Sequence, residues 1–227
     1  PVVVMGPASF AGADPVGVRV RNVTEFGFEY RVEEWDYLDG IHLSEEVGWV
    51  AVESGVHIME NGQRIVAGTV SAGDAGADVD YGVDLDADAV VMAQVASTND
   101  PFPVTADVTR ADGTGFRVDL REEEAADGLH DPETVGFIAS ELGGLPSDGF
   151  LARRTGQVVD DGESVVDLGG SIPGGFALLA QVQTNASPDP ATIRVSEQTD
   201  ASVRLFIDEE ESLDAETGLA PADAGLL

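Results

Sequence analysis

The sequence predicts an all-β protein built from tandem small antiparallel β-sandwiches. Three observations predict this class. A segment of about 88 residues recurs along the chain, short runs alternate apolar and polar residues, and clusters of Gly, Asp, Asn and Pro separate those runs. A helical pattern of about ten residues or more is absent, apart from a candidate around 208–217. Tandem units of this kind would form an elongated all-β rod.

The repeat is clearest between residues 27–55 and 115–143, which align without a gap. Both stretches contain Gly-Phe, then Asp-Gly-x-His-x-x-Glu, then Val-Gly-aromatic-x-Ala. The third copy has drifted, and DEEESLDA at 208–215 stands where the second copy has REEEAADG. We therefore expect a partial first repeat at 1–55, a full second repeat at 56–143, and a divergent third repeat at 144–227 that could be incomplete.

Period-two alternation places the strands within each repeat. They are expected at 2–9, 17–24, 26–34 and 47–53 in the first repeat, and at 90–97, 104–111, 115–123 and 135–141 in the second. The acidic stretch before each Asp-Gly lacks alternation and is expected to form a loop. Four aromatic side chains on these strands should fill the sandwich cores, namely Phe28, Trp49, Phe116 and Phe137.

The charge of the chain is extreme and evenly distributed. Acidic residues number 43 against 11 basic ones, giving a net charge of −32, and every basic residue is an arginine. At molar salt the Debye length falls to about 3 Å, so repulsion that would destabilise this chain in dilute buffer is screened. The composition indicates a protein of a halophile, a haloarchaeon or its virus. It disfavours nucleic acid as a partner, because phosphate would be repelled.

Other function classes find no support in the sequence. The chain has no cysteine, and no apolar run approaches the roughly 18–20 residues of a membrane-spanning helix, so membrane insertion is not expected. Phosphate-binding loops are absent, and the three histidines form no triad with a credible serine. We expect a protein that is not an enzyme, has no catalytic residues and requires no cofactor.

The repeated Asp-Gly-x-His-x-x-Glu segment has two interpretations. Asp39, His42 and Glu45, with their counterparts Asp127, His130 and Glu133, could each hold a cation such as Ca²⁺ or Na⁺. Alternatively, Asp-Gly forms a turn and the Glu leads into the next strand. The second interpretation is favoured, because a repeat module keeps the loop that holds its fold. The third copy has Thr217 in place of the histidine.

A second candidate site is the aromatic pair Trp35 and Tyr37, which lies in an acidic loop of the first repeat only. These side chains could stack on a sugar ring, or they could be buried against a neighbouring chain.

The segment VRVRNVTEFGFEYRVEEWDYLDGIHLSEEVGWVAVESG at 18–55, and less closely 104–143, resembles the H-type lectin domain and its tandem relatives in prokaryotic surface proteins. The resemblance implies a six-stranded antiparallel sandwich, a tendency to form trimers, and sugar binding between protomers. It covers mainly framework segments, so no sugar-binding residue is transferred. The acidic Asp-Gly-x-His loop departs from the animal lectins.

The function expected from these observations is that of a surface module outside the cell. The leading hypothesis is an adhesion or host-recognition segment of a fibre or spike, on a cell or virion surface, whose partners are cell-surface glycans or glycoproteins. The alternative is a structural spacer or assembly subunit of a virion tail, a capsid decoration or an extracellular filament. In either case we expect self-association into a homotrimer or another symmetric homo-oligomer.

The halophile hypothesis predicts how stability depends on salt. In dilute buffer the protein should loosen or unfold, and multi-molar NaCl should restore the fold, because screening removes the repulsion among carboxylates. Circular dichroism melts over a range of salt concentrations measure this. A melting temperature independent of salt would contradict the hypothesis.

Overall fold

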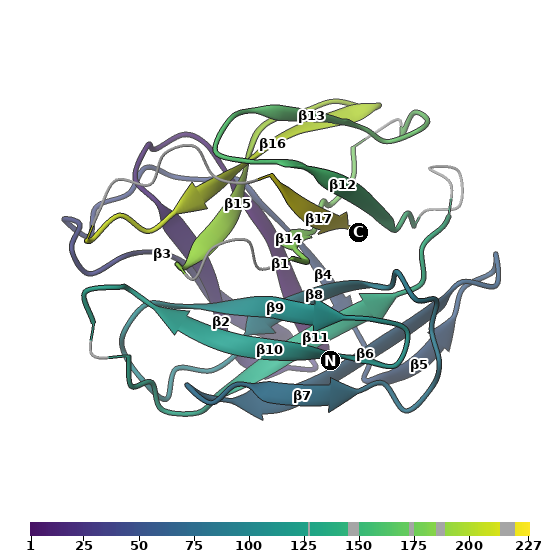
Figure 1. The fold of residues 1–227 in the computed structure, drawn as a ribbon, viewed down its shortest axis with the longest axis horizontal. Helices are drawn as coiled ribbons and strands as arrows, with labels where there is room; N and C mark the ends of the chain where they lie inside the picture. Colours follow the sequence, from purple (N-terminus) through teal and green to yellow (C-terminus); the bar gives the residue numbers. More distant parts are fainter. Residues whose placement is uncertain (127, 145–149, 173–174, 185–188, 214–220) are drawn as a thin grey trace.

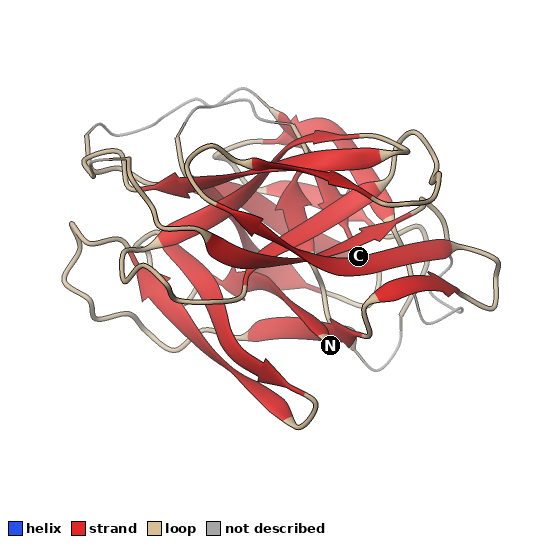
Figure 2. Cartoon of the chain, turned by 90° about the horizontal axis from the view of Figure 1, so that it is seen from below, coloured by secondary structure: helices blue, strands red, loops and turns tan. Residues whose placement is uncertain are grey.

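The computed structural model describes residues 1–227 except 127, 145–149, 173–174, 185–188 and 214–220. Every regular element in the described residues is a β-strand, as Figures 1 and 2 show. The predicted all-β class with tandem sandwiches is confirmed. The strand β16 occupies the start of the candidate helix at 208–217, residues 210–213 are not helical, and 214–217 lie outside the described residues. The described residues contain no helix able to cross a membrane.

The second repeat forms a sandwich of two sheets that pack face to face around Phe116 and Phe137. One sheet has the order β5 (Gly55–Ile58), β6 (Arg64–Ala72), β11 (Glu133–Ser140) and β8 (Val90–Val95). The other has the order β7 (Ala77–Asp80), β10 (Gly115–Glu122) and β9 (Val104–Ala111). All pairings in this sandwich are antiparallel.

The third repeat has the same strand order around a second core. One sheet is β12 (Arg153–Val159), β17 (Ala222–Leu226) and β14 (Ala180–Val182). Facing it are β13 (Ser164–Asp167), β16 (Ser202–Glu209) and β15 (Ala191–Gln198). Each strand of the third repeat thus corresponds to one strand of the second repeat. For example, β12 corresponds to β6, and β17 corresponds to β11.

The first repeat consists of four strands in the described residues. The strand β1 (Val2–Ser9) pairs with β4 (Val47–Val52), as β8 pairs with β11. The strands β2 (Val16–Thr24) and β3 (Gly27–Glu34) pair as β9 and β10 do. No described strand takes the place of β6 beside β4 or of β7 beside β3. The end of β1 also pairs in parallel with β15, which joins the first and third repeats.

The three repeats close into a ring instead of forming the expected rod, and Figure 1 shows their strands gathered in one body. A glycine on the last strand of each repeat lies against another repeat: Gly136 against Val2 of β1, Gly225 against Val90 of β8, and Gly48 against Leu178, just before β14. An added side chain at Gly225 would come within 2.6 Å of Val90. Glycine therefore permits the close approach of neighbouring repeats.

The expectation that Trp49 fills a core was wrong. Phe137, its counterpart in the second repeat, is buried against Gly68 of β6. Trp49 is 51% exposed, because no described strand covers β4 on that side, and it contacts only the edge of Phe28 among aromatic rings. The core positions of Phe116 and Phe137 were predicted correctly.

Candidate functional site

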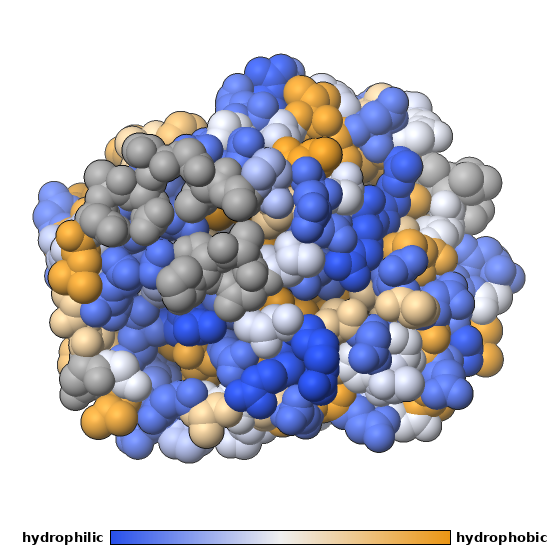
Figure 3. All heavy atoms as spheres, viewed as in Figure 1, coloured by the Kyte–Doolittle hydropathy of each residue, from blue (hydrophilic) through white to orange (hydrophobic). Residues whose placement is uncertain are grey.

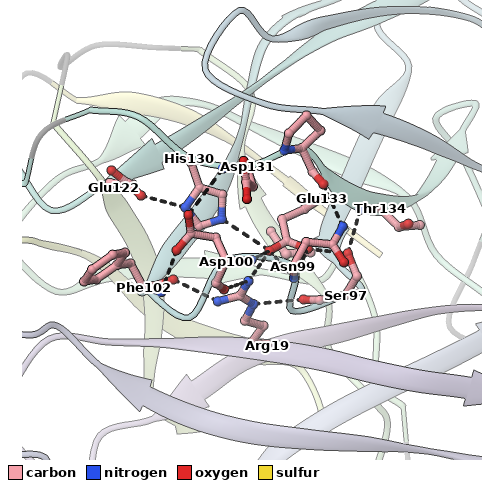
Figure 4. A network of polar contacts seen from close by, with 12 residues as sticks. Arg19, Ser97, Asn99, Asp100, Phe102, Glu122, His130, Asp131, Glu133 and Thr134 are labelled. Carbon is pink, nitrogen blue, oxygen red and sulfur yellow. Dashed lines mark hydrogen bonds and ion pairs between the residues drawn. The ribbon is translucent and has the colours of Figure 1, made fainter.

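The strongest polar contacts in the molecule lie between repeats, where a buried arginine enters the neighbouring repeat. Arg19 on β2 reaches into the loop after β8, as Figure 4 shows. Its guanidinium donates to the carbonyl oxygens of Ser97 (3.0 Å), Asp100 (2.8 Å) and Phe102 (2.8 Å). It also forms an ion pair of 2.5 Å with the carboxylate of Glu133. Both side chains are almost completely buried.

Glu133 holds the same loop from the other side. Its carboxylate accepts from the backbone N–H groups of Asn99 (2.8 Å) and Asp100 (2.9 Å) and from the hydroxyl of Ser97. Burial acts to raise the pKa of Glu133, but these hydrogen bonds and the charge of Arg19 outweigh it and lower the pKa. Glu133 is therefore ionised and fully paired, which is the condition for a buried charge to be tolerated.

The same contact recurs between the third and first repeats. Arg194 on β15, at the position equivalent to Arg19, donates to the carbonyl oxygens of Ser9 (2.7 Å), Gly12 (3.2 Å) and Asp14 (3.2 Å). It pairs at 3.0 Å with Glu45, the counterpart of Glu133. The carboxylate of Glu45 in turn accepts from the N–H groups of that loop. Two of the three contacts between repeats thus have the same arrangement, a buried strand arginine paired with a buried glutamate.

The remaining contact, between the second and third repeats, lacks such an ion pair, and two strand positions of the second repeat have their charges exchanged. Asp107 occupies the arginine position, and Arg121 stands where the first and third repeats have Glu33 and Asp208. The two side chains pair within the second repeat at 3.6 Å. The glutamate is absent here too, because the pairing of β17 places Ala222 where β11 has Glu133. An arginine at 107 would therefore find no carboxylate at that position.

Glutamine side chains strengthen two of the contacts in a matching way. Gln94 donates to the carbonyl of Val18 (2.7 Å) and accepts from the N–H of Met5 (3.3 Å). Gln181, one repeat later, donates to Ala106 and accepts from Ala93, each at 2.5 Å. Gly6 occupies the equivalent position in the first repeat, where the carbonyl of Leu178 leaves no room for a side chain.

A cavity of about 150 Å³ lies where the three repeats meet. Strands from every repeat line it, and the lining mixes apolar side chains with polar ones, Gln94, Gln181, Asp107 and Thr184 among them. Burial raises the pKa of Asp107 to about 7, and the nearby Arg121 only partly offsets this effect. Asp107 is thus expected to titrate near neutral pH.

The predicted Asp-Gly-x-His-x-x-Glu residues lie in or beside these contacts. His42 and Glu45 come together, with Nδ1 of His42 3.6 Å from the carboxylate, while exposed Asp39 instead accepts from the N–H of Ile41. His130 lies 3.4 Å from Glu133 and 2.6 Å from Glu122. Asp127 and Thr217 lie outside the described residues. The glutamates thus serve the contacts between repeats, in line with the structural interpretation of the motif.

A different trio brings possible cation ligands close together. Ligand atoms of Asp100, Glu122 and His130 lie within 4.8 Å of one another. The N–H of Phe102 helps to lower the pKa of Asp100. Carboxylate oxygens and one imidazole nitrogen suit several divalent metals. Only His130 belongs to both this trio and the predicted motif.

The predicted aromatic pair is split by the fold. Trp35 is 3% exposed, so its ring presents no surface to a ligand in this conformation. Tyr37 is 38% exposed, and its hydroxyl accepts from the N–H of Glu211 at 3.2 Å. The N–H of Tyr37 donates to Glu123. Tyr37 thus bridges the acidic loops of the three repeats.

Sequence reasoning missed Arg19 and Arg194. A signal was present, because each is a charged residue in a strand of a chain that has only 11 basic residues. In so acidic a protein, an arginine on an alternating strand is a candidate for a buried ion pair. The identity of its partner was not readable, since Glu133 lies 114 residues away from Arg19 in the sequence.

The fold and these contacts define a protein of tandem β-sandwich repeats joined by buried ion pairs. No family model matches the sequence, and no solved structure matches it. The chain is similar to halomucin from Haloquadratum walsbyi, a haloarchaeon, with 30% identity over 200 residues, or 85% of this chain. The chain spans only 2% of the length of that relative.

Removing one buried carboxylate should destabilise the ring. Glu133→Gln leaves Arg19 without its counter-charge, and breaking a buried pair of this kind costs about 3–5 kcal/mol. Urea unfolding in multi-molar NaCl measures the loss. Glu29→Gln is the matched control, because Glu29 forms an exposed pair with Arg21, so its loss should cost about 0–1 kcal/mol. Equal effects of the two substitutions would contradict the assigned role.

The raised pKa of Asp107 predicts that stability changes with pH in the direction opposite to that expected for an ordinary paired carboxylate. Its pKa is raised in the folded state, so the folded protein binds more protons than the unfolded chain, and stability falls as pH rises from about 4 to 7. Asp107→Asn should remove this loss and raise the melting temperature more at pH 8 than at pH 4.5. A stabilisation that does not change with pH would contradict the prediction.

Proposed function

We propose that this chain is a rigid, non-enzymatic segment of a haloarchaeal surface protein. The observation that carries the proposal is the closure of three repeats into one ring by buried arginine–glutamate contacts. These contacts join loops to the strands of neighbouring repeats. Such a ring is a mechanically robust building block, which suits a long extracellular polypeptide.

Two further observations support an extracellular role. The relative is named a halomucin, and mucins are extracellular proteins. The net charge of −32 is carried over the surface, and Figure 3 shows hydrophilic side chains spread over one face with only small separate apolar groups. A carboxylate-rich surface retains water when salt competes for it.

Adhesion through glycans is the finer part of the proposal. Of the predicted aromatic pair, Tyr37 offers exposed ring surface beside acidic loops, an arrangement able to stack on a sugar and accept its hydroxyl hydrogen bonds. Repetition along a long polypeptide would add avidity to weak sites. A spacer role in a filament or virion is the alternative. Formation of a homotrimer and binding of Ca²⁺ or Na⁺ remain predictions.

Surface location and glycan binding can be tested separately. Antibodies raised against this chain should label intact haloarchaeal cells that carry its gene, and external protease should remove the signal. A glycan array in molar salt should then show binding that Tyr37→Ala abolishes and the exposed-loop control Phe26→Ala preserves. Labelling only after lysis would refute the surface role, while an array without signal would leave the spacer role and discard adhesion.

A further inference from the structure

One face of the first repeat exposes side chains that are core residues in the other two. Tyr30 is 56% exposed, yet its counterparts Val118 and Leu205 are completely buried. Trp49 is half exposed, while its counterparts Phe137 and Leu226 are buried. Each pair of counterparts follows from the equivalent pairings of β3, β10 and β16 and of β4, β11 and β17.

The two exposed rings and half-buried Phe28 form one continuous patch. Phe28 is the centre, with its ring centroid 5.2 Å from that of Trp49 and 6.3 Å from that of Tyr30. Beneath it lie Val3, Met5 and Val20, the small core of the first repeat. We call Phe28, Tyr30 and Trp49 the aromatic patch. It is the inner face of a half-covered sandwich rather than a scatter of surface residues.

The second repeat shows what covers this face. There β6 pairs with β11 so that Gly68 lies opposite Phe137, and β7 pairs with β10 so that Val79 lies opposite Phe116. The absence of a side chain at Gly68 matters, because an added Cβ would lie 2.8 Å from the Phe137 ring. In the first repeat both corresponding strand edges, of β4 and of β3, have no described partner.

We propose that the first repeat is a strand acceptor, and that its occupant is a pair of strands with the pattern of residues 64–80, from a neighbouring repeat of a longer polypeptide. The two donor strands pair with the outer edges of β4 and β3 and cover the aromatic patch. Backbone hydrogen bonds along both edges supply affinity, and alternate side chains supply selectivity.

The register of the acceptor follows from the second repeat. The donor residue equivalent to Gly68 lies opposite Trp49, and it must be small because the indole is larger than the phenyl ring of Phe137. The equivalent of Val70 lies opposite Val47, and the equivalent of Val79 lies opposite Phe28. The equivalent of Asp78 comes opposite Glu29, so this contact needs screening by salt or a neutral donor residue.

The two donor strands would complete the first sandwich of the ring from another segment of the same polypeptide. Once paired along both edges, that segment could not rotate freely relative to the ring. The proposal does not depend on surface location or glycan binding, because it rests only on the uncovered face. Its failure would therefore leave the proposed function untouched.

A designed fusion tests the proposal directly. A second copy of residues 62–89 is joined ahead of Pro1, because Ala89 precedes β8 just as Pro1 precedes β1. In multi-molar NaCl the added strands should cover Trp49, lower its quenching by acrylamide several-fold, shift its emission to shorter wavelength and raise the melting temperature. The fusion carrying Trp49→Phe identifies which part of the signal belongs to Trp49.

A matched control separates specific pairing from mere tethering. The same fusion with Gly68→Phe in the added copy alone should leave Trp49 exposed, since the new ring would occupy the space of the indole. Unchanged quenching in the unmodified fusion, or equal protection by the Gly68→Phe fusion, would overturn the proposal. Protection by a separate peptide of residues 62–89, without protection in the fusion, would overturn the same-polypeptide source.

Discussion

The arrangement of the repeats depends on a buried guanidinium that crosses from one repeat into a loop of the next. Arg19 satisfies three carbonyl oxygens and one carboxylate at once, and Arg194 does the same at the equivalent position. In a separate repeat either side chain would be solvated, and docking buries both with their charges matched. A repeat that docked without the matching charge would leave a buried charge unpaired, so these pairs favour the observed contacts between repeats.

Screening by salt accounts for the burial of the ion pairs that stabilise the ring. In molar salt, exposed pairs such as Arg21–Glu29 contribute little, because exposed pairs are worth only about 0–1 kcal/mol and salt screens them further. Buried pairs are screened much less. A chain with only 11 basic residues therefore gains most by placing some of them at contacts that water and ions do not reach.

The sequence was sufficient for the fold class and for the strands β1–β4 and β8–β11, but not for β5–β7, for the strands of the third repeat or for the arrangement of the repeats. Period-two alternation located β2, β9 and β10 because each of these strands has one more deeply buried face. Alternation could not show that Trp49 is exposed, because this exposure results from the lack of a described strand along the outer edge of β4. The Asp-Gly-x-His-x-x-Glu segment was recognised as a repeated signature, yet the role of Glu133 depends on an arginine in another repeat. Long-range partners of this kind leave no local periodicity to read.

The exchanged charges of Asp107 and Arg121 help to select which repeats can be neighbours in the ring. A repeat with a glutamate at the position of Glu133 requires an arginine from its neighbour. The third repeat has Ala222 at this position, so it requires a neighbour without that arginine. Exchanging two repeats would bury a charge without its partner at one contact and leave a carboxylate unmatched at another. Although the three units share a fold, the residues at the arginine and glutamate positions suit one another at all three contacts only in the observed cyclic order, so charge matching favours that order over the reverse.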